Sequence, residues 1–290
     1  MSTFKFLQLA DTQFGLFAHI SKKSPEERAD MVSRGLKVRP IPPMEGFRPE
    51  AELFEQAVHA ANRVNPAFVV MCGDMVNDIN NPDQVDEVLR IAAKLNDGIA
   101  IYWVAGNHDA ATDTLHPEPK SLATYRAAFG DDYYSFQHQD SSFIVLNSPV
   151  MQHPEQVLDE WESEYRFLRQ ELIAAKARNS SQIILFTHHP LFGQSAREPD
   201  SYWNIPLERR MPVLELLRTY GVSAVFAGHW HRNNYAFDGN MQMVTTGSVG
   251  FPLGDDPSGY RAVTVFDDLI EHEYRALPGY EPIEHRSDSP

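Results

Sequence analysis

The stretch Ala105-Gly-Asn-His-Asp-Ala110 follows directly on the apolar run Ile99-Ala-Ile-Tyr-Trp-Val104. Such a run is typical of a buried strand, so the polar residues after it should emerge at the carboxyl edge of a sheet, where open α/β sheets bind ligands. The glycine suits a sharp turn, Asn107 offers an amide oxygen to a metal ion, and His108 offers an imidazole that can transfer a proton. Asp109 is placed to orient that histidine. Such residues also form ordinary turns, so the function of the stretch depends on its companions.

Four further apolar runs end in the same way, at residues that can bind metal ions. The runs and the residues after them are 4–10 before Asp11 and Gln13, 67–72 before Asp74, 183–187 before His188, and 222–227 before His229 and His231. One carboxylate that bridges two ions, with oxygen and imidazole ligands on either side, is a recurrent way to hold two divalent cations about 3.5–4 Å apart. Each unit alone is also explained by a loop histidine or a capping aspartate. Taken together and in this order, the five units predict a binuclear metal site.

The order of these motifs resembles that of the calcineurin-like metallophosphoesterases. The signature of that family runs Asp-x-His, Gly-Asp, Gly-Asn-His-(Asp/Glu), His and Gly-His-x-His. This chain matches it with Asp11, 73–74, 106–109, His188 and 228–231, and has Gln13 where the family has histidine. Asp-x-Gln followed by Phe-Gly-Leu is similar to one branch of the family, the calcineurin-like phosphoesterase domain-containing or complete serine/threonine phosphatases. The resemblance covers nearly the whole chain, from about residue 4 to 277.

The resemblance implies a role for each of these residues. Metal 1 would be held by Asp11, Gln13, Asp74 and His231, and metal 2 by Asp74, Asn107, His188 and His229. The two divalent ions would be Mn, Fe, Zn or Mg, and a neutral amide at Gln13 favours a harder ion such as Mn²⁺ or Mg²⁺ at metal 1. A metal-bound hydroxide would attack phosphorus, and His108, held by Asp109, would protonate the leaving oxygen. An ordinary loop amide remains the alternative for Gln13.

Three functions are compatible with this site. The resemblance implies a metal-dependent phosphatase that hydrolyses phosphate monoesters of a small molecule or a phosphoprotein, such as a protein serine/threonine phosphatase. A phosphodiesterase acting on cyclic nucleotides or other diesters uses the same metal core and differs mainly in the loops over it. A non-catalytic metal-bound scaffold is the third, with Gln13 as the first sign of decay. Against decay, Asn107, His108 and Asp109 are all present, and a scaffold needs no proton donor.

Two polar segments are expected to lie over the site and to contact the substrate, together with Asn107 and His108. Residues 19–50 form a long proline-containing stretch without strong periodicity, which is expected to be a loop insertion; a disordered decoration is the alternative. Residues 193–206 hold Arg197 and Tyr202, which either recognise the phosphorylated group or form a rim.

The remaining pattern predicts an α/β fold. Apolar residues at helical spacing recur between the strands over 53–64, 85–95, 157–172 and 211–217, and a short helix is expected near 120–129. Asn81 should cap the helix that starts at Pro82. Runs at 241–246, 260–266 and 270–274 are expected to form strands of a second sheet. The family resemblance implies a four-layer α/β/β/α sandwich of two mixed β-sheets, with one domain over 1–278 and a polar tail over 279–290.

The amino-acid composition limits the classes of molecule that the protein is expected to bind. The formal net charge of −15 over 290 residues argues against nucleic acid and anionic membranes, which would need a basic face. No apolar run approaches the roughly 18 residues of a membrane span. The one cysteine, Cys72, cannot form an internal disulfide, and we expect the chain to open into a core strand without a cleavable leader. A cytoplasmic location is therefore expected, whereas the oligomeric state stays open.

Overall fold

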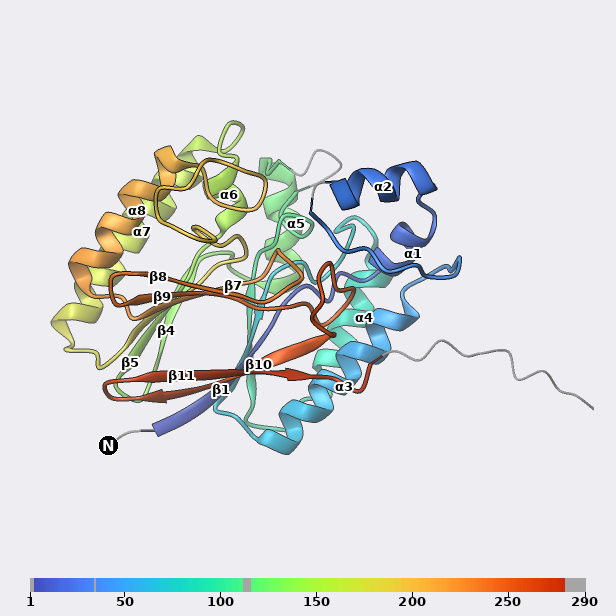
Figure 1. Cartoon of the computed structure of the whole chain (residues 1–290). Helices are drawn as coiled ribbons and strands as arrows, with labels where there is room; N and C mark the ends of the chain where they lie inside the picture. Colours follow the sequence, from blue (N-terminus) through green and yellow to red (C-terminus); the bar gives the residue numbers. More distant parts are fainter. Residues whose placement is uncertain (1–2, 34, 112–115, 280–290) are drawn as a thin grey trace, which may run out of the picture.

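The strands form two sheets that face each other (Figure 1) in the computed structural model, which describes residues 3–33, 35–111 and 116–279. The five-stranded sheet has the order β11 (Ile270–Ala276), β10 (Gly259–Phe266), β1 (Thr3–Leu9), β2 (Phe68–Cys72) and β3 (Ala100–Val104). The six-stranded sheet has the order β4 (Tyr134–His138), β5 (Ser141–Val145), β6 (Ile183–Phe186), β7 (Ala224–Ala227), β9 (Met241–Thr245) and β8 (Asn234–Asp238). Parallel neighbours β1–β2–β3 and β5–β6–β7–β9 are flanked by antiparallel strands, so both sheets are mixed, as predicted.

Helices cover the outer face of each sheet. The first sheet carries α3 (Arg48–Val64), α4 (Pro82–Ala92) and α5 (Pro119–Phe129), and the second carries α6 (Ser148–Gln152), α7 (Leu158–Ala177) and α8 (Leu207–Tyr220). Figure 1 shows α7 and α8 on one side of the paired sheets and α3 and α4 on the other. The predicted four-layer α/β/β/α sandwich is thus confirmed. Among the helices described, none has both the length and the apolar character needed to cross a bilayer.

Aromatic side chains fill the space between the sheets. The rings of Phe6 and Phe68, from the first sheet, stack with centroids 5.0 Å apart. Phe186 and Phe226, from the second sheet, meet Phe6 edge-on, each at 5.6 Å. Strands buried on both faces read as continuous apolar runs, which is why the sequence marked them clearly. This packing fixes the two sheets against each other. The residues at the strand ends of one sheet are therefore held in a fixed position relative to those of the other.

Strand partners differ from the sequence prediction. The three runs expected in one second sheet divide between both sheets: β9 pairs with β7, whereas β10 pairs antiparallel with β1 and β11 with β10. An apolar pattern shows that a segment is a strand but does not encode which strand it pairs with. The short polar strand β8 was not predicted. The cap at Asn81 is confirmed, since its side chain accepts from Asp83 N at 3.1 Å.

The segment 19–50 is not a structureless loop. It contains the end of α1 (Leu16–Ser21), all of α2 (Pro25–Ser33) and the start of α3. Both extra helices are short, and Met31 is the one buried residue of α2, so the apolar period was too weak to detect. The predicted tail 279–290 lies, apart from its first residue, outside the described residues.

Glu50 anchors the first turn of α1. Its Oε1 accepts hydrogen bonds from the backbone N–H groups of Gly15 at 3.1 Å and Phe17 at 2.8 Å. These N–H groups lie at a helix start, where no preceding carbonyl can accept them. The side chain is fully buried, and its Oε2 has no partner among the described residues. Burial raises the pKa of the Glu50 carboxyl from 4.5 to about 7, against the opposing effect of the backbone donors.

We expect Glu50→Gln to flatten the pH dependence of thermal stability. Because folding raises this pKa, the stabilisation is complete below pH 4.5 and is lost as the pH rises through about 7. Glutamine keeps an oxygen for both N–H groups and does not ionise. The variant should therefore gain on the order of 2–3 kcal/mol over the parent above that pH. Unfolding temperatures between about pH 5 and 8 measure this, with Glu52→Gln on the same helix as control. Equal slopes for the parent and Glu50→Gln would contradict it.

Candidate metal centre

The strand ends of both sheets meet at one edge and bring the predicted ligands together. Asp11 and Gln13 follow β1, Asp74 follows β2, Asn107 follows β3, His188 follows β6, and His229 and His231 follow β7. Backbone hydrogen bonds join these segments, from Asp11 N to Gly73 O and from Gly228 N to His188 O, each at 3.0 Å. All seven side chains belong to buried residues.

One group of donors corresponds to metal 1. Ligand atoms of Asp11, Asp74 and His231 lie within 4.8 Å of one another, with His231 Nε2 at 3.4 Å from Asp11 Oδ1. The carbonyl of Phe251 lies 2.6 Å from His231 Nδ1, which leaves Nε2 for a ligand. Gln13 Oε1 is buried without a hydrogen-bond partner among the described residues. A buried amide oxygen without a partner, on a side chain that lines the same cavity as Asp74 and His231, fits a cation.

A second group corresponds to metal 2. His188 Nε2 lies 3.0 Å from Asn107 Oδ1, 3.3 Å from Asp74 Oδ2 and 3.2 Å from His229 Nδ1. The other nitrogen of His188 is 2.9 Å from Cys72 O, and His229 Nε2 is 3.0 Å from Tyr202 O, so each ring is oriented by a carbonyl. Asp74 is common to both groups, which is the position of a bridging carboxylate.

Charge in this cluster is concentrated and shielded from water. Burial holds the pKa of the Asp11 carboxyl well above its usual range. Burial would lower the pKa of His188, but the carboxylates of Asp74 and Asp11 raise it to about 9. Buried carboxylates need a compensating positive charge. Carboxylate, amide and imidazole donors together suit divalent ions, so the residues present fit the two cations that the sequence implies.

Backbone strain marks the same positions. Of the eight non-glycine residues with positive φ in the described part of the chain, Asp11, Gln13, Asp74, His229 and His231 are five predicted ligands. Left-handed backbone is unfavourable for residues other than glycine, and such strain gathers where function requires it. Here each left-handed residue turns the chain sharply at the strand end, so that its side chain faces the cluster.

Two glycines allow these segments to approach each other. A Cβ at Gly106 would lie 2.1 Å from the backbone nitrogen of Asp74, and a Cβ at Gly73 would lie 2.4 Å from His188 Nδ1. Any larger residue would force the ligand-bearing turns apart. The glycines that precede Asp74 and Asn107 in the sequence are therefore explained by close backbone contact.

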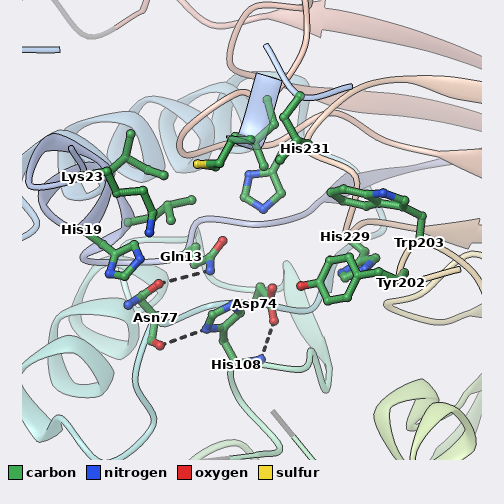
Figure 2. Close-up of a pocket in the computed structure, with 15 residues that line it drawn as sticks. Gln13, His19, Lys23, Asp74, Asn77, His108, Tyr202, Trp203, His229 and His231 are labelled. Carbon is green, nitrogen blue, oxygen red and sulfur yellow. Dashed lines mark hydrogen bonds between the residues drawn. The ribbon is translucent and has the colours of Figure 1, made fainter. Parts of the chain in front are cut away.

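The contacts of His108 differ from the sequence prediction. Its Nδ1 lies 3.0 Å from the carbonyl of Asn77, and its backbone N–H donates to Asp74 Oδ1 at 2.9 Å (Figure 2). Asp109, expected to hold this ring, instead accepts from the N–H groups of Met75, Val76 and Gly106 at 2.9, 3.2 and 2.9 Å. Asp109 thus braces the two ligand turns, and Asn77 orients the imidazole. Since Nδ1 is engaged, Nε2 is the nitrogen that remains for a substrate.

A cavity of about 310 Å³ opens over the cluster. Its lining includes Gln13, Asp74, His108, His229 and His231, and on one side Tyr202. Figure 2 shows Tyr202 and Trp203 across the cavity from His19 and Lys23.

Arg197 does not reach this cavity. It is exposed and is not among the described residues that line it. The neighbouring Glu198 turns inward instead, because its carboxylate accepts from the N–H groups of Gly193, Gln194 and Ser195. This placement favours a rim position for Arg197, which was the alternative to a substrate contact.

Asn77 was not predicted as a residue of the site, whereas Trp203 belongs to the segment 193–206 that was expected to lie over it. Asn77 orients His108 and also accepts from Gln13 Nε2 at 3.2 Å. Trp203 lines the cavity, and its carbonyl accepts from Trp230 Nε1. His189 packs beside the metal 2 donors, with Nδ1 at 3.1 Å from Ser148 Oγ. Asn77 belongs to no recognisable motif, and its only signal in the sequence was its closeness to Asp74.

Comparison with known proteins agrees with this geometry. The sequence model described as calcineurin-like phosphoesterase matches residues 4–233. The serine/threonine-protein phosphatase CPPED1 of Bos taurus is 32% identical over 280 residues, which cover 94% of this chain and 84% of the bovine protein.

Solved structures show the same fold. A dimetal phosphatase from Danio rerio superposes with a TM-score of 0.64 at 18% identity, covering 94% of this chain and 96% of that one. The purple acid phosphatase PPD1 of yellow lupin, Lupinus luteus, gives a TM-score of 0.63 at 15% identity, covering 95% of this chain and 52% of the lupin chain.

Proposed function

Because the chain belongs to the calcineurin-like phosphoesterase family, and is thus a metal-dependent phosphoric ester hydrolase, we propose that its substrates are phosphate monoesters, with phosphoserine or phosphothreonine of a protein as the physiological class. One observation carries the proposal: His108, with Nε2 available, lines the same cavity as the predicted metal ligands Asp74, His229 and His231. The similarity to serine/threonine-protein phosphatases over 94% of the chain supports the monoester class.

Two divalent cations are part of the proposal. Asp11, Gln13, Asp74 and His231 would hold one, and Asp74, Asn107, His188 and His229 the other. When bound, such ions supply positive charge to phosphoryl oxygens and lower the pKa of water. The amide oxygen of Gln13 favours Mn²⁺ or Mg²⁺ over softer ions at the first position.

The residues of the chain supply the proton and the geometry. The Asn77 carbonyl accepts the Nδ1–H of His108, so a protonated ring presents its second N–H from Nε2 toward the leaving oxygen. Asp109 holds the backbone of the Met75 and Gly106 turns, which fixes the relative positions of Asp74 and His108. Lys23 is the one lysine or arginine among the described residues that line the cavity, and it adds positive charge for an anionic substrate.

The cellular location and the binding partner of the enzyme are also part of the proposal. A cytoplasmic location is supported by Cys72, a buried free thiol. The net charge of −15 supports a phosphorylated protein or small molecule, rather than nucleic acid, as partner.

Hydrolysis of p-nitrophenyl phosphate and of its bis(p-nitrophenyl) diester tests the proposal. Metal-stripped protein should be inactive, and Mn²⁺ should restore turnover with a higher kcat/KM for the monoester. A higher kcat/KM for the diester would assign a phosphodiesterase instead. Absence of metal-dependent turnover of both esters would contradict the proposed function.

A further inference from the structure

One wall of the catalytic cavity is apolar, although the reacting group is a phosphate. Five aliphatic or thioether side chains form it: Leu16, Ile20, Met31, Leu36 and Leu253. All are buried in the core around α1 and α2, yet they also border the cavity. A phosphate gains nothing from such a surface, whereas an apolar group removed from water does.

The apolar wall is tied directly to the predicted ligands. Leu16 N donates to Gln13 O at 2.9 Å, and Leu253 N donates to His231 O at 3.2 Å. An apolar group on this wall therefore lies beside the phosphate rather than at a remote subsite. At about 310 Å³ the cavity is at the lower end of the roughly 300–1,000 Å³ of ligand pockets, so the group must be small.

The wall is also held in place before a substrate arrives. Lys37 N donates to Leu253 O at 3.0 Å, which links the segment after α2 to the loop that follows β9. Arg232 donates to Gly35 O at 3.2 Å, and its guanidinium lies 5.8 Å from the Trp203 ring and 5.3 Å from the Trp230 ring. These contacts join the two sides of the cavity mouth, and a preorganised apolar wall binds without an ordering cost.

We infer that the enzyme selects phosphate monoesters that carry a small apolar group within a few bonds of the ester oxygen, seated on the apolar wall. This inference rests on the proposed monoesterase function and specifies its substrate class. The group is either the alkyl or aryl part of a small phosphate, or an apolar side chain next to a phosphorylated serine or threonine. Both sources share the same chemistry.

The first experiment is a series of n-alkyl phosphates from methyl to hexyl, assayed by phosphate release with Mn²⁺ present. Each methylene that enters the wall should raise kcat/KM about three- to fourfold, or roughly 30- to 60-fold over three methylenes. The matching alkylphosphonates, which have no ester oxygen to cleave, should inhibit with constants that fall by the same steps. A flat series would overturn the inference while leaving the monoesterase intact. Failure to hydrolyse any member would instead overturn the proposed function.

Neighbouring residues of α2 provide a matched pair of variants. Met31 is 8% exposed and lines the cavity, whereas Val32 is 56% exposed and is not among its described lining residues. Met31→Gln should reduce the gain per methylene, Met31→Leu should preserve it, and Val32→Gln should leave the series as in the parent. An unaltered slope in folded Met31→Gln would contradict the assignment of the wall.

A second assay, with phosphopeptides, distinguishes an apolar peptide side chain from the apolar part of a small phosphate. Phosphoserine peptides with alanine or leucine directly before or after the phosphoserine are compared for kcat/KM. A preference for leucine of about tenfold or more would assign the wall to a peptide side chain. A chain-length response confined to the alkyl phosphates would assign it to small molecules.

Discussion

Asp74→Asn is expected to remove metal-dependent turnover almost completely. Asp74 is the carboxylate shared by both donor groups, with Oδ2 at 3.3 Å from His188 Nε2 and the other oxygen accepting from His108 N. The amide keeps the shape of the side chain but removes one negative charge from a buried site. Mutation of a residue that only hydrogen-bonds to a metal ligand typically lowers metal affinity by roughly 10–100-fold. Because Asp74 is itself a predicted ligand, its mutation should lower metal affinity by more than this, and kcat/KM by on the order of 10³-fold.

Metal binding can be followed independently of activity in this variant. Mn²⁺ should raise the unfolding temperature of the parent, because a ligand that binds only the folded state stabilises it, and should have little effect on Asp74→Asn. Asp78→Asn is the matched control, since Asp78 is exposed four residues further along the same segment. Metal content equal to that of the parent after dialysis would exclude Asp74 as a ligand.

The sequence predicted the site best where a residue that can bind a metal ion directly follows an apolar strand. Asp74, Asn107 and His188 each follow an apolar run at a strand end, and parallel strands bring such ends to one edge. Period and spacing therefore predicted that these strand ends lie together, whereas the family resemblance implied which residues bind each metal ion. Gln13 was the uncertain member, because spacing alone cannot show that its Oε1 is buried without a hydrogen-bond partner among the described residues.

The sequence was least informative about long-range contacts made by the backbone. The hydrogen-bond partner of His108 Nδ1 is the backbone carbonyl of Asn77. Because every residue has a backbone carbonyl, the residue type at position 77 does not predict this role. Asp109 was assigned to the ring because it is adjacent in sequence, but adjacent side chains after a turn point in different directions. The apolar wall was hidden for a related reason: α1 and α2 are too short to show a period.

His108→Ala is expected to lower turnover in a way that depends on the leaving group. A positioned general acid contributes roughly 10²–10⁴-fold when the departing oxygen needs a proton. An alkyl phosphate releases a basic alkoxide and should lose that full factor, whereas p-nitrophenyl phosphate releases a stable phenolate and should lose much less. Asp74, His188 and the other donors remain, so metal content should stay near that of the parent.

The ratio of the two losses identifies the role of His108. A structural role, such as positioning Asp74 through the backbone N–H at 2.9 Å, would lower turnover of both esters equally, and alanine retains that N–H in any case. His59→Ala, at an exposed position of α3, controls for removal of an imidazole elsewhere. Equal losses for both substrates would remove His108 from proton transfer. A loss confined to the alkyl ester would place the donated proton at Nε2, the nitrogen that the Asn77 carbonyl leaves available.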